Sequence, residues 1–200
     1  MIRKLRVQLI LAAMASLFAV LAVIIGAVHV LSYRKVLTDA DTVLAVLMEN
    51  GGHFPRPDRV GKAPPPRVAS PEIPYESRYF FVLLSADGSP VLADTGKIAA
   101  VSKETAMDYA RAVWEKGREK GFVGDYRYSV KEADSGVRVV FLDRGRTLSS
   151  FRSNLWTSLL VSLLGFLAVL VLMICISSRA VRPVAESYAK QKRFITDAGH

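Results

Sequence analysis

Residues 153–178 read SNLWTSLLVSLLGFLAVLVLMICISS, a stretch of 26 residues without Asp, Glu, Lys or Arg. A helix of that length extends about 39 Å at about 1.5 Å per residue, which exceeds the roughly 30 Å hydrocarbon core of a bilayer. Residues 7–33 form a second stretch that lacks the same four residue types. The two stretches predict two transmembrane helices, and the rest of the chain divides around them.

Basic residues ahead of the first apolar stretch raise the alternative of a cleaved signal peptide. Arg3, Lys4 and Arg6 would form its positively charged leader. The apolar region of a signal peptide is about 7–15 residues long and ends near a small-residue cleavage site. The stretch 7–33 is longer and continues into an amphipathic segment. We therefore predict an uncleaved signal anchor, with the cleaved peptide as the alternative.

The formal net charge of +9 is spread over the whole chain. Residues 1–33 hold three basic and no acidic side chains, residues 34–152 hold nineteen and sixteen, and residues 153–200 hold five and two. A nucleic-acid-binding protein concentrates its basic residues on one face, so we expect no nucleic-acid partner. Basic residues close to a span favour the cytoplasmic side, which predicts cytoplasmic ends at residues 1–6 and 179–200 and an extracytoplasmic domain between the spans.

Apolar residues continue beyond the first span at spacings of three and four, from Val36 to Met48. This spacing predicts that the first helix extends as a stalk over residues 34–50, until Gly51-Gly52 ends it. Residues 53–77 hold seven of the nine prolines and show no apolar period, which predicts an extended loop.

The next segment, residues 78–143, has the pattern of a small sensor domain. Ser102 is placed to cap a helix whose apolar residues recur at helical spacing. Aromatic, branched and alternating residues predict strands at 78–85, 91–93, 126–131 and 137–142. The order strand, strand, helix, strand, strand predicts an α+β fold, an antiparallel sheet with a helix on one face, of the kind found in PAS-like and Cache-like sensors.

This domain carries no recognisable catalytic motif. It lacks a local pair of carboxylates, a glycine-rich phosphate loop, a nucleophile elbow and metal-ligand spacing. Two interpretations suit its basic and aromatic residues Arg78, Tyr126, Arg127 and Tyr128. They line a pocket for a small anion or a peptide, or they belong to an ordinary sheet with one apolar and one solvated face.

The cysteine and the first two histidines indicate neither a metal site nor a redox site. Cys175 is the only cysteine, which excludes an intrachain disulfide and a thiolate metal cluster. His53 has no partner at metal-ligand spacing, and we expect His29 in the headgroup region rather than in a ligand site.

The segment after the second span predicts a further helix. Pro183 suits its first turn, and residues 184–200 contain no Gly or Pro before Gly199. His200 follows Ala198 by about 200° around such a helix, so its imidazole faces away from the seam and is exposed. The seam itself predicts a homodimer, and its members are Val184, Tyr188, Gln191, Ile195 and Ala198.

Residues 191–200, QKRFITDAGH, resemble the start of the H-box of sensor histidine kinases in bacterial two-component systems. In that family this histidine is the phosphoacceptor, so the resemblance assigns the role to His200. An exposed imidazole suits the role, because its nitrogen must reach a nucleotide phosphate and later a partner's aspartate. FVGDYRY at residues 122–128 and VFLD at residues 140–143 are similar to the sensor region of a Gram-positive-type subgroup.

The resemblance implies a function for the whole chain. The protein would reside in a bacterial cell membrane as a homodimer and pass an extracytoplasmic stimulus, of unidentified ligand, to autophosphorylation of His200. The phosphoryl group would then move to a cognate response regulator. The family's ATP-binding domain, which uses ATP with Mg²⁺, follows the H-box. We therefore expect residues 1–200 to be the sensor portion of a longer enzyme and to bind no cofactor themselves.

Two alternatives to the kinase stay open. In the first, the chain is a non-enzymatic membrane receptor or adaptor, chemoreceptor-like, whose tail recruits a separate effector. Sequence beyond His200 separates it from a kinase, because nucleotide-binding motifs indicate the kinase and long heptads indicate the receptor. In the second, the chain is a structural anchor with a passive domain, and deletion of residues 53–145 would leave the behaviour of the tail unchanged.

Overall fold

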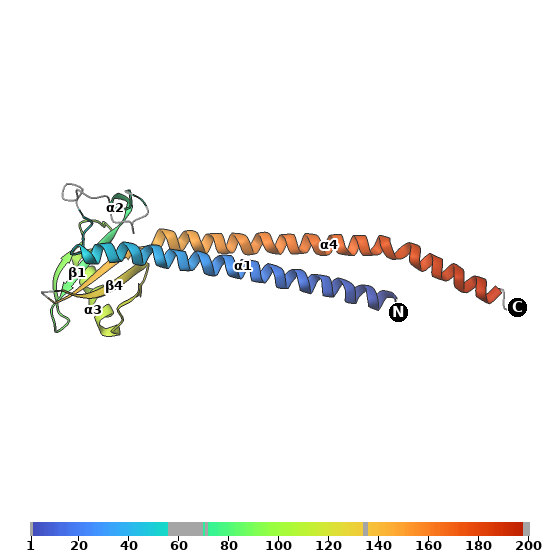
Figure 1. Cartoon of the computed structure of the whole chain (residues 1–200), viewed down its shortest axis with the longest axis horizontal. Coiled ribbons are helices and arrows are strands. Elements are labelled where there is room, and N and C mark those ends of the chain that lie inside the picture. The colour runs from blue at the N-terminus through green and yellow to red at the C-terminus, as the bar shows by residue number, and fades with distance from the viewer. Residues whose placement is uncertain (1, 56–69, 71, 134–135, 198–200) are drawn as a thin grey trace. The chain divides into compact units, whose positions relative to one another are not determined.

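The computed structural model describes residues 2–55, 70, 72–133 and 136–197. Leu31–Arg152 form one compact unit, here called the folded domain, and the remaining parts of two long helices form the other. The helices among these described residues are α1 (Ile2–Glu49), α2 (Ile73–Glu76), α3 (Lys103–Lys116) and α4 (Gly145–Asp197), as labelled in Figure 1.

One antiparallel sheet of five strands forms the centre of the folded domain. Its order is β2-β1-β5-β4-β3, so the first and last strands of the chain pair in the middle. The strands are β1 (Tyr79–Leu84), β2 (Pro90–Asp94), β3 (Lys120–Val123), β4 (Tyr126–Ala133) and β5 (Gly136–Asp143). The α+β class and the antiparallel sheet agree with the sequence prediction. The predicted element order is wrong in one respect, because it lacked β3.

The two central strands are buried on both faces. Along β1, Phe80 and Val82 point to one face while Tyr79 and Phe81 point to the other, and none of the four is more than 6% exposed. The central strand β5 alternates in the same way through Val139, Val140, Phe141 and Leu142. A sheet with such strands requires an apolar cover on each side.

Helix α3 covers the first face. The hydroxyl oxygen of Ser102 accepts a hydrogen bond from the backbone N–H of Thr105 at 3.2 Å, which is the N-cap predicted from the sequence. Ala106, Ala110 and Val113 are buried at spacings of four and three. Gly117 ends the helix in the left-handed region, at φ 59°.

The C-terminal part of α1 covers the second face. The sequence predicted a stalk and one covered face, whereas the stalk packs on the sheet and completes the core. Gly52 follows the helix with φ +93° and donates its N–H to the carbonyl of Leu47 at 2.7 Å. The α1 side chains in this core are Ala40, Val43, Leu44, Leu47 and Met48, packed against Tyr79, Phe81, Val140 and Leu142.

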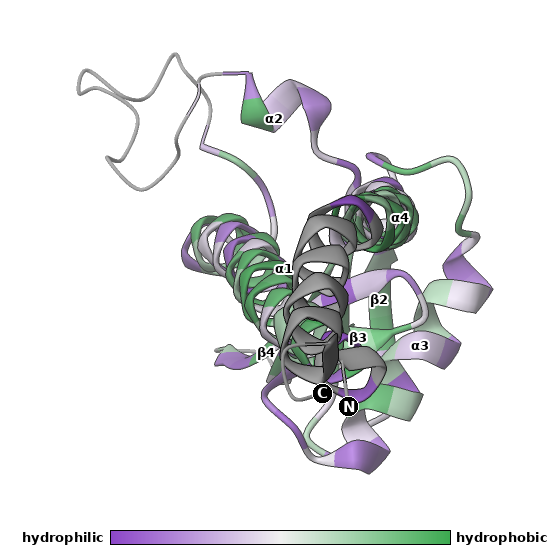
Figure 2. Ribbon diagram, turned by 90° about the vertical axis from the view of Figure 1, so that its right-hand side faces the viewer, coloured by the Kyte–Doolittle hydropathy of each residue, from purple (hydrophilic) through white to green (hydrophobic). Residues whose placement is uncertain are grey.

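Two helices are long and apolar enough to cross a membrane, Arg6–Glu49 and Gly145–Ser177. Only 6% of the apolar window of the first, and none of the second, is buried inside the protein, unlike the core helix of a soluble protein. Figure 2 shows hydrophobic residues along both helices. Within the helical unit, the rings of Phe18 and Phe166 meet edge to face at 6.2 Å.

Helix α4 continues without a break to Asp197. The predicted helix start at Pro183 is wrong, because the helix runs through this residue. A proline inside a helix lacks the N–H for one backbone hydrogen bond and bends the helix. Figure 1 shows that α4 changes direction in its C-terminal part. Helix α2 forms one turn within the expected loop 53–77, of which residues 56–69 and 71 lie outside the described residues.

Candidate functional site

The sheet joins α4 through a single residue. Strand β5 ends at Asp143, Arg144 follows, and α4 begins at Gly145. The Asp143 carboxylate accepts a hydrogen bond from the Gly145 N–H at 2.9 Å and pairs with the Arg78 guanidinium at 3.1 Å. The Asp143 N–H donates to the carbonyl of Arg78 at 2.9 Å. The first turn of α4 is therefore fixed to the sheet.

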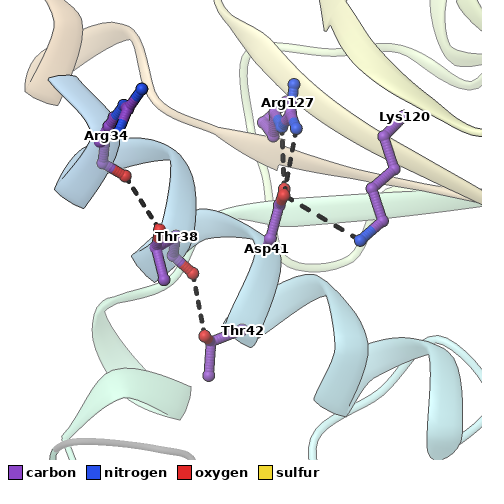
Figure 3. Close-up of polar contacts among 6 residues, drawn as sticks. All are labelled: Arg34, Thr38, Asp41, Thr42, Lys120 and Arg127. Atoms are coloured by element: carbon purple, nitrogen blue, oxygen red, sulfur yellow. Dashed lines mark hydrogen bonds and ion pairs between the residues drawn. The ribbon is translucent and has the colours of Figure 1, made fainter.

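A polar contact joins α1 to strands β3 and β4 of the same sheet (Figure 3). Arg127 of β4 donates from Nε and Nη2 to the two carboxylate oxygens of Asp41, at 2.9 and 3.1 Å. Lys120 of β3 lies 4.0 Å from the same carboxylate. The Arg127 guanidinium also stacks over the Phe122 ring, 5.1 Å from its centroid. We call Asp41, Lys120, Phe122 and Arg127 the Asp41 clamp.

The clamp is partly shielded from water, which strengthens it relative to a surface ion pair. The side chains of Arg127 and Asp41 are 14% and 29% exposed, and the bidentate geometry holds both in one arrangement. The nearby hydroxyls of Thr38 and Thr42 donate to the carbonyls of Arg34 and Thr38, one turn back (Figure 3). These hydroxyls bond within α1 and take no part in the clamp.

A cleft of about 860 Å³ opens beside the start of α4. Its wall comes from α1, α2, the residues ahead of β1 and the first turn of α4, and we call it the α4 cleft. Besides the Arg78–Asp143 pair, its charged lining residues are Lys35, Asp39, Glu76, Arg144 and Arg146. The wall is therefore polar and carries one more cation than carboxylates.

Arg144 is the least solvated of these cations. Its Nε is shielded from solvent and has no hydrogen-bond partner within the part of the chain that the structure describes. Burial lowers the pKa of Arg144, while the nearby carboxylates of Asp39 and Asp143 act in the opposite direction. An additional anionic partner would stabilise a guanidinium that is shielded from water in this way.

A second cleft, of about 720 Å³, lies at the C-terminal end of α3. Val113, Trp114, Val130 and Val137 supply much of its apolar lining. Gly88 sits beside it, where a Cβ would lie 2.3 Å from the Trp114 ring nitrogen. The charged residues Arg118, Glu119, Lys131 and Glu132 complete much of the lining, so this α3 cleft has one apolar and one charged part.

The residues Arg78, Tyr126, Arg127 and Tyr128, which one interpretation of the sequence placed in a single pocket, do not line one pocket in the structure. Tyr128 is 1% exposed and packs with Phe80 and Phe141 on the α3 side. Tyr126 packs against the same core, whereas Arg127 points to α1. Only Arg78 lines the α4 cleft. The ordinary sheet thus explains Tyr126 and Tyr128, whereas Arg127 forms an ion pair with α1 whose carboxylate, Asp41, the sequence did not predict.

The predicted phosphoacceptor His200 lies outside the described residues. Of the other two histidines, His53 pairs with Asp94 at 3.7 Å, and the Nε2 of His29 is 2.7 Å from the hydroxyl of Ser158, on the other long helix of the helical unit. No group of three His, Cys, Asp or Glu side chains able to hold a metal occurs among the described residues. Cys175 is exposed on α4.

Comparisons of the chain with protein-family models, with curated proteins and with solved structures found no match. The features of the described residues that bear on function are the attachment of α1 through the Asp41 clamp, the attachment of α4 through Asp143, and the two clefts.

Proposed function

We propose that the chain is the sensor portion of a membrane-bound sensor histidine kinase. The observation that carries this proposal is the direct attachment of one small sheet to both long apolar helices. Helix α1 is fixed by its apolar stripe and the Asp41 clamp, and α4 is fixed by the contacts of Asp143. A change in the sheet therefore acts on two helices at once.

In this proposal both helices cross the membrane, and the folded domain is extracytoplasmic. Their apolar surface is largely unburied, which suits lipid contact. The basic residues next to the two spans favour a cytoplasmic location for both ends of the chain, which orients the helices in the membrane. The strand order β2-β1-β5-β4-β3 with a helix on each face supports a sensor domain of the PAS-like or Cache-like kind, although a fold alone does not name a ligand.

Signal transfer would be a shift or rotation of α4 relative to α1 in a homodimer. The shift would control the transfer of the γ-phosphoryl group from Mg²⁺-bound ATP, held by a domain C-terminal to this chain, to a ring nitrogen of His200. ADP leaves in that step. The phosphoryl group then passes from the histidine to an aspartate carboxylate of a response regulator, which restores the free imidazole.

The test uses the protein extended through its nucleotide-binding domain, in membranes with radiolabelled ATP. We expect the wild-type protein to acquire an acid-labile label and His200→Gln to acquire none. His53→Gln is the matched control, because it removes an exposed histidine of the folded domain. Equal labelling of the wild type and of His200→Gln would contradict the kinase proposal.

The unbroken course of α4 from Gly145 to Asp197 favours a second candidate. A long continuous helix with no separate linker also suits a chemoreceptor-like protein whose tail recruits an effector. Such a protein would acquire no phosphate in the same assay and would capture its effector equally well with His200→Gln.

A further inference from the structure

We propose that the α4 cleft binds a phosphate group, carried either by free inorganic phosphate or by a lipid headgroup. The proposal rests on the donors that converge at the start of α4 and does not depend on the kinase assignment. Only the lipid source depends on both long helices crossing the membrane.

The first turn of α4 supplies backbone donors to the cleft. The first hydrogen bond within this helix runs from the Leu148 N–H to the Arg144 carbonyl, at 2.8 Å. The Asp143 carboxylate occupies the N–H of Gly145. This leaves the N–H groups of Arg146 and Thr147 ahead of any helical acceptor, and both residues line the cleft. The first turn itself contains no acidic residue, and the Asp143 carboxylate just before it faces the positive end of the helix dipole.

Side chains bring positive charge to the same place. Arg78 is paired with Asp143, so Lys35, Arg144 and Arg146 face the two remaining carboxylates, Asp39 and Glu76. The balance is one positive charge, which an anion with one negative charge matches.

The desolvated guanidinium of Arg144 points to the class of anion. Its Nε is hidden from solvent and lacks a partner among the described residues, and its neighbours on the cleft wall are the carboxylates of Asp39 and Asp143, the Arg146 side chain and the backbone N–H groups of the first turn. Donors that approach from several directions suit a tetrahedral oxyanion, which offers an oxygen to each. Arginine pairs with phosphate through two parallel hydrogen bonds, so a phosphate group fits this wall.

The position of the cleft along the two long helices makes a lipid headgroup one possible source. Lys35 follows the apolar stretch 7–33 by two residues, about 3 Å along α1, and Arg146 precedes the stretch 153–178 by about 10 Å along α4. If both stretches lie in the bilayer, headgroup phosphates are within reach of these side chains. The volume of about 860 Å³ exceeds that of free phosphate and leaves room for a headgroup.

The test is calorimetric titration of the full chain in maltoside micelles that contain no phosphate. One arm titrates inorganic phosphate, and the other titrates short-chain phosphatidylglycerol in the same micelles. We expect Arg146→Gln to weaken binding at least tenfold, because its side chain is exposed and its loss leaves the core intact. Arg111→Gln is the matched control, since Arg111 is exposed on α3 and forms only a 3.5 Å pair with Asp108.

The outcomes separate the two sources. Binding of phosphate alone indicates a free anion, and binding of the lipid alone or of both indicates a headgroup. Absence of binding in both arms overturns the proposal, as does equal weakening by Arg146→Gln and Arg111→Gln, which would indicate a general charge effect. Circular dichroism of each variant verifies the fold. Arg144→Gln provides a second variant, and unchanged affinity in both Arg144→Gln and Arg146→Gln would also overturn the proposal.

Discussion

At the scale of single residues, Asp41 connects α1 to two strands through one carboxylate. Its hydrogen bonds to Arg127 are 2.9 and 3.1 Å long, and the arginine side chain is only 14% exposed. Loss of the carboxylate charge leaves a poorly solvated guanidinium with a weaker acceptor. Hydrogen bonds to charged groups contribute about 1.5–3 kcal/mol when they are shielded from water.

We therefore expect Asp41→Asn to lower the free energy of unfolding of the folded domain by about 2 kcal/mol. Chemical denaturation in micelles, followed by circular dichroism, measures the loss. Asp108→Asn is the control, because it removes a 3.5 Å pair whose two side chains are 59% and 73% exposed. Such surface pairs contribute little to stability. Equal losses in the two variants would show that the clamp is no stronger than a surface pair.

Gly51 and Gly52 offer a matched pair of substitutions at the end of α1. Both have positive φ, +73° and +93°, but only Gly52 lacks room for a side chain, because a Cβ would lie 2.6 Å from the ring of Phe81. We expect Gly51→Ala to cost about 1 kcal/mol through its backbone conformation alone. Gly52→Ala should cost at least about 3 kcal/mol, since a clash in the core is added to the strain. Thermal unfolding compares the two, and similar melting temperatures would contradict the close contact.

At the scale of elements, the strands β1 and β4 each hold a tyrosine that resists ionisation. Burial raises the pKa of Tyr79, opposed by a backbone hydrogen bond at Phe54. Burial also raises the pKa of Tyr126, and the charge of Asp143 adds to the effect. The unfolded chain ionises first, near about pH 10, so stability is present below that pH and is lost as the pH rises through the folded-state values.

We expect the free energy of unfolding to fall between about pH 9 and pH 11, and to fall less steeply in Tyr126→Phe. Denaturation curves at a series of pH values measure this slope. Tyr75→Phe is the control, because Tyr75 is 78% exposed. A slope that is unchanged in Tyr126→Phe, or that changes equally in the control, would contradict the assignment.

Local sequence signals predicted the elements whose cause is local. Ser102 followed by apolar residues at helical spacing identified α3, and the aromatic and branched run of residues 78–85 identified β1. The missed strand β3 has only two apolar residues in Lys120–Val123, too few to show alternation. Its signal was the two-residue turn Gly124-Asp125, with φ 55° at the glycine, which places Val123 opposite Tyr126 in a hairpin.

Long-range packing was harder to read from the chain. The prediction of one covered face overlooked the apolar side chains Tyr79, Phe81, Val140 and Leu142 on the face opposite α3, which require a second cover. Asp41 gave no local signal, because its partner Arg127 is 86 residues away. Pro183 and the run without Gly or Pro after it predicted a new helix, whereas the backbone continues one that begins at Gly145.

At the scale of the whole molecule, α4 is one helix from the sheet to the last described residues. A residue inserted into a helix turns everything beyond it by about 100°, and seven residues make nearly two complete turns. If the folded domain controls His200 through α4, insertions after Arg179 should act through this rotation.

We expect one inserted alanine to change the phosphorylation level of the extended protein severalfold, and seven inserted alanines to return it close to the wild-type level. The labelling assay in membranes measures both variants. If the two insertions give the same level, rotation of α4 does not carry the signal. His200→Gln in each background shows that the label is on the histidine.

The packing of α1 against the sheet also decides where the folded domain can be cut for separate expression. A fragment that starts at residue 53 would lose Ala40, Val43 and Leu47 and leave the second face of the sheet bare. An apolar face of that kind drives self-association in water. A fragment that starts at residue 34, directly after the apolar stretch, keeps its own cover and the cleft residue Lys35, and it is the one to use for crystallisation and ligand screening.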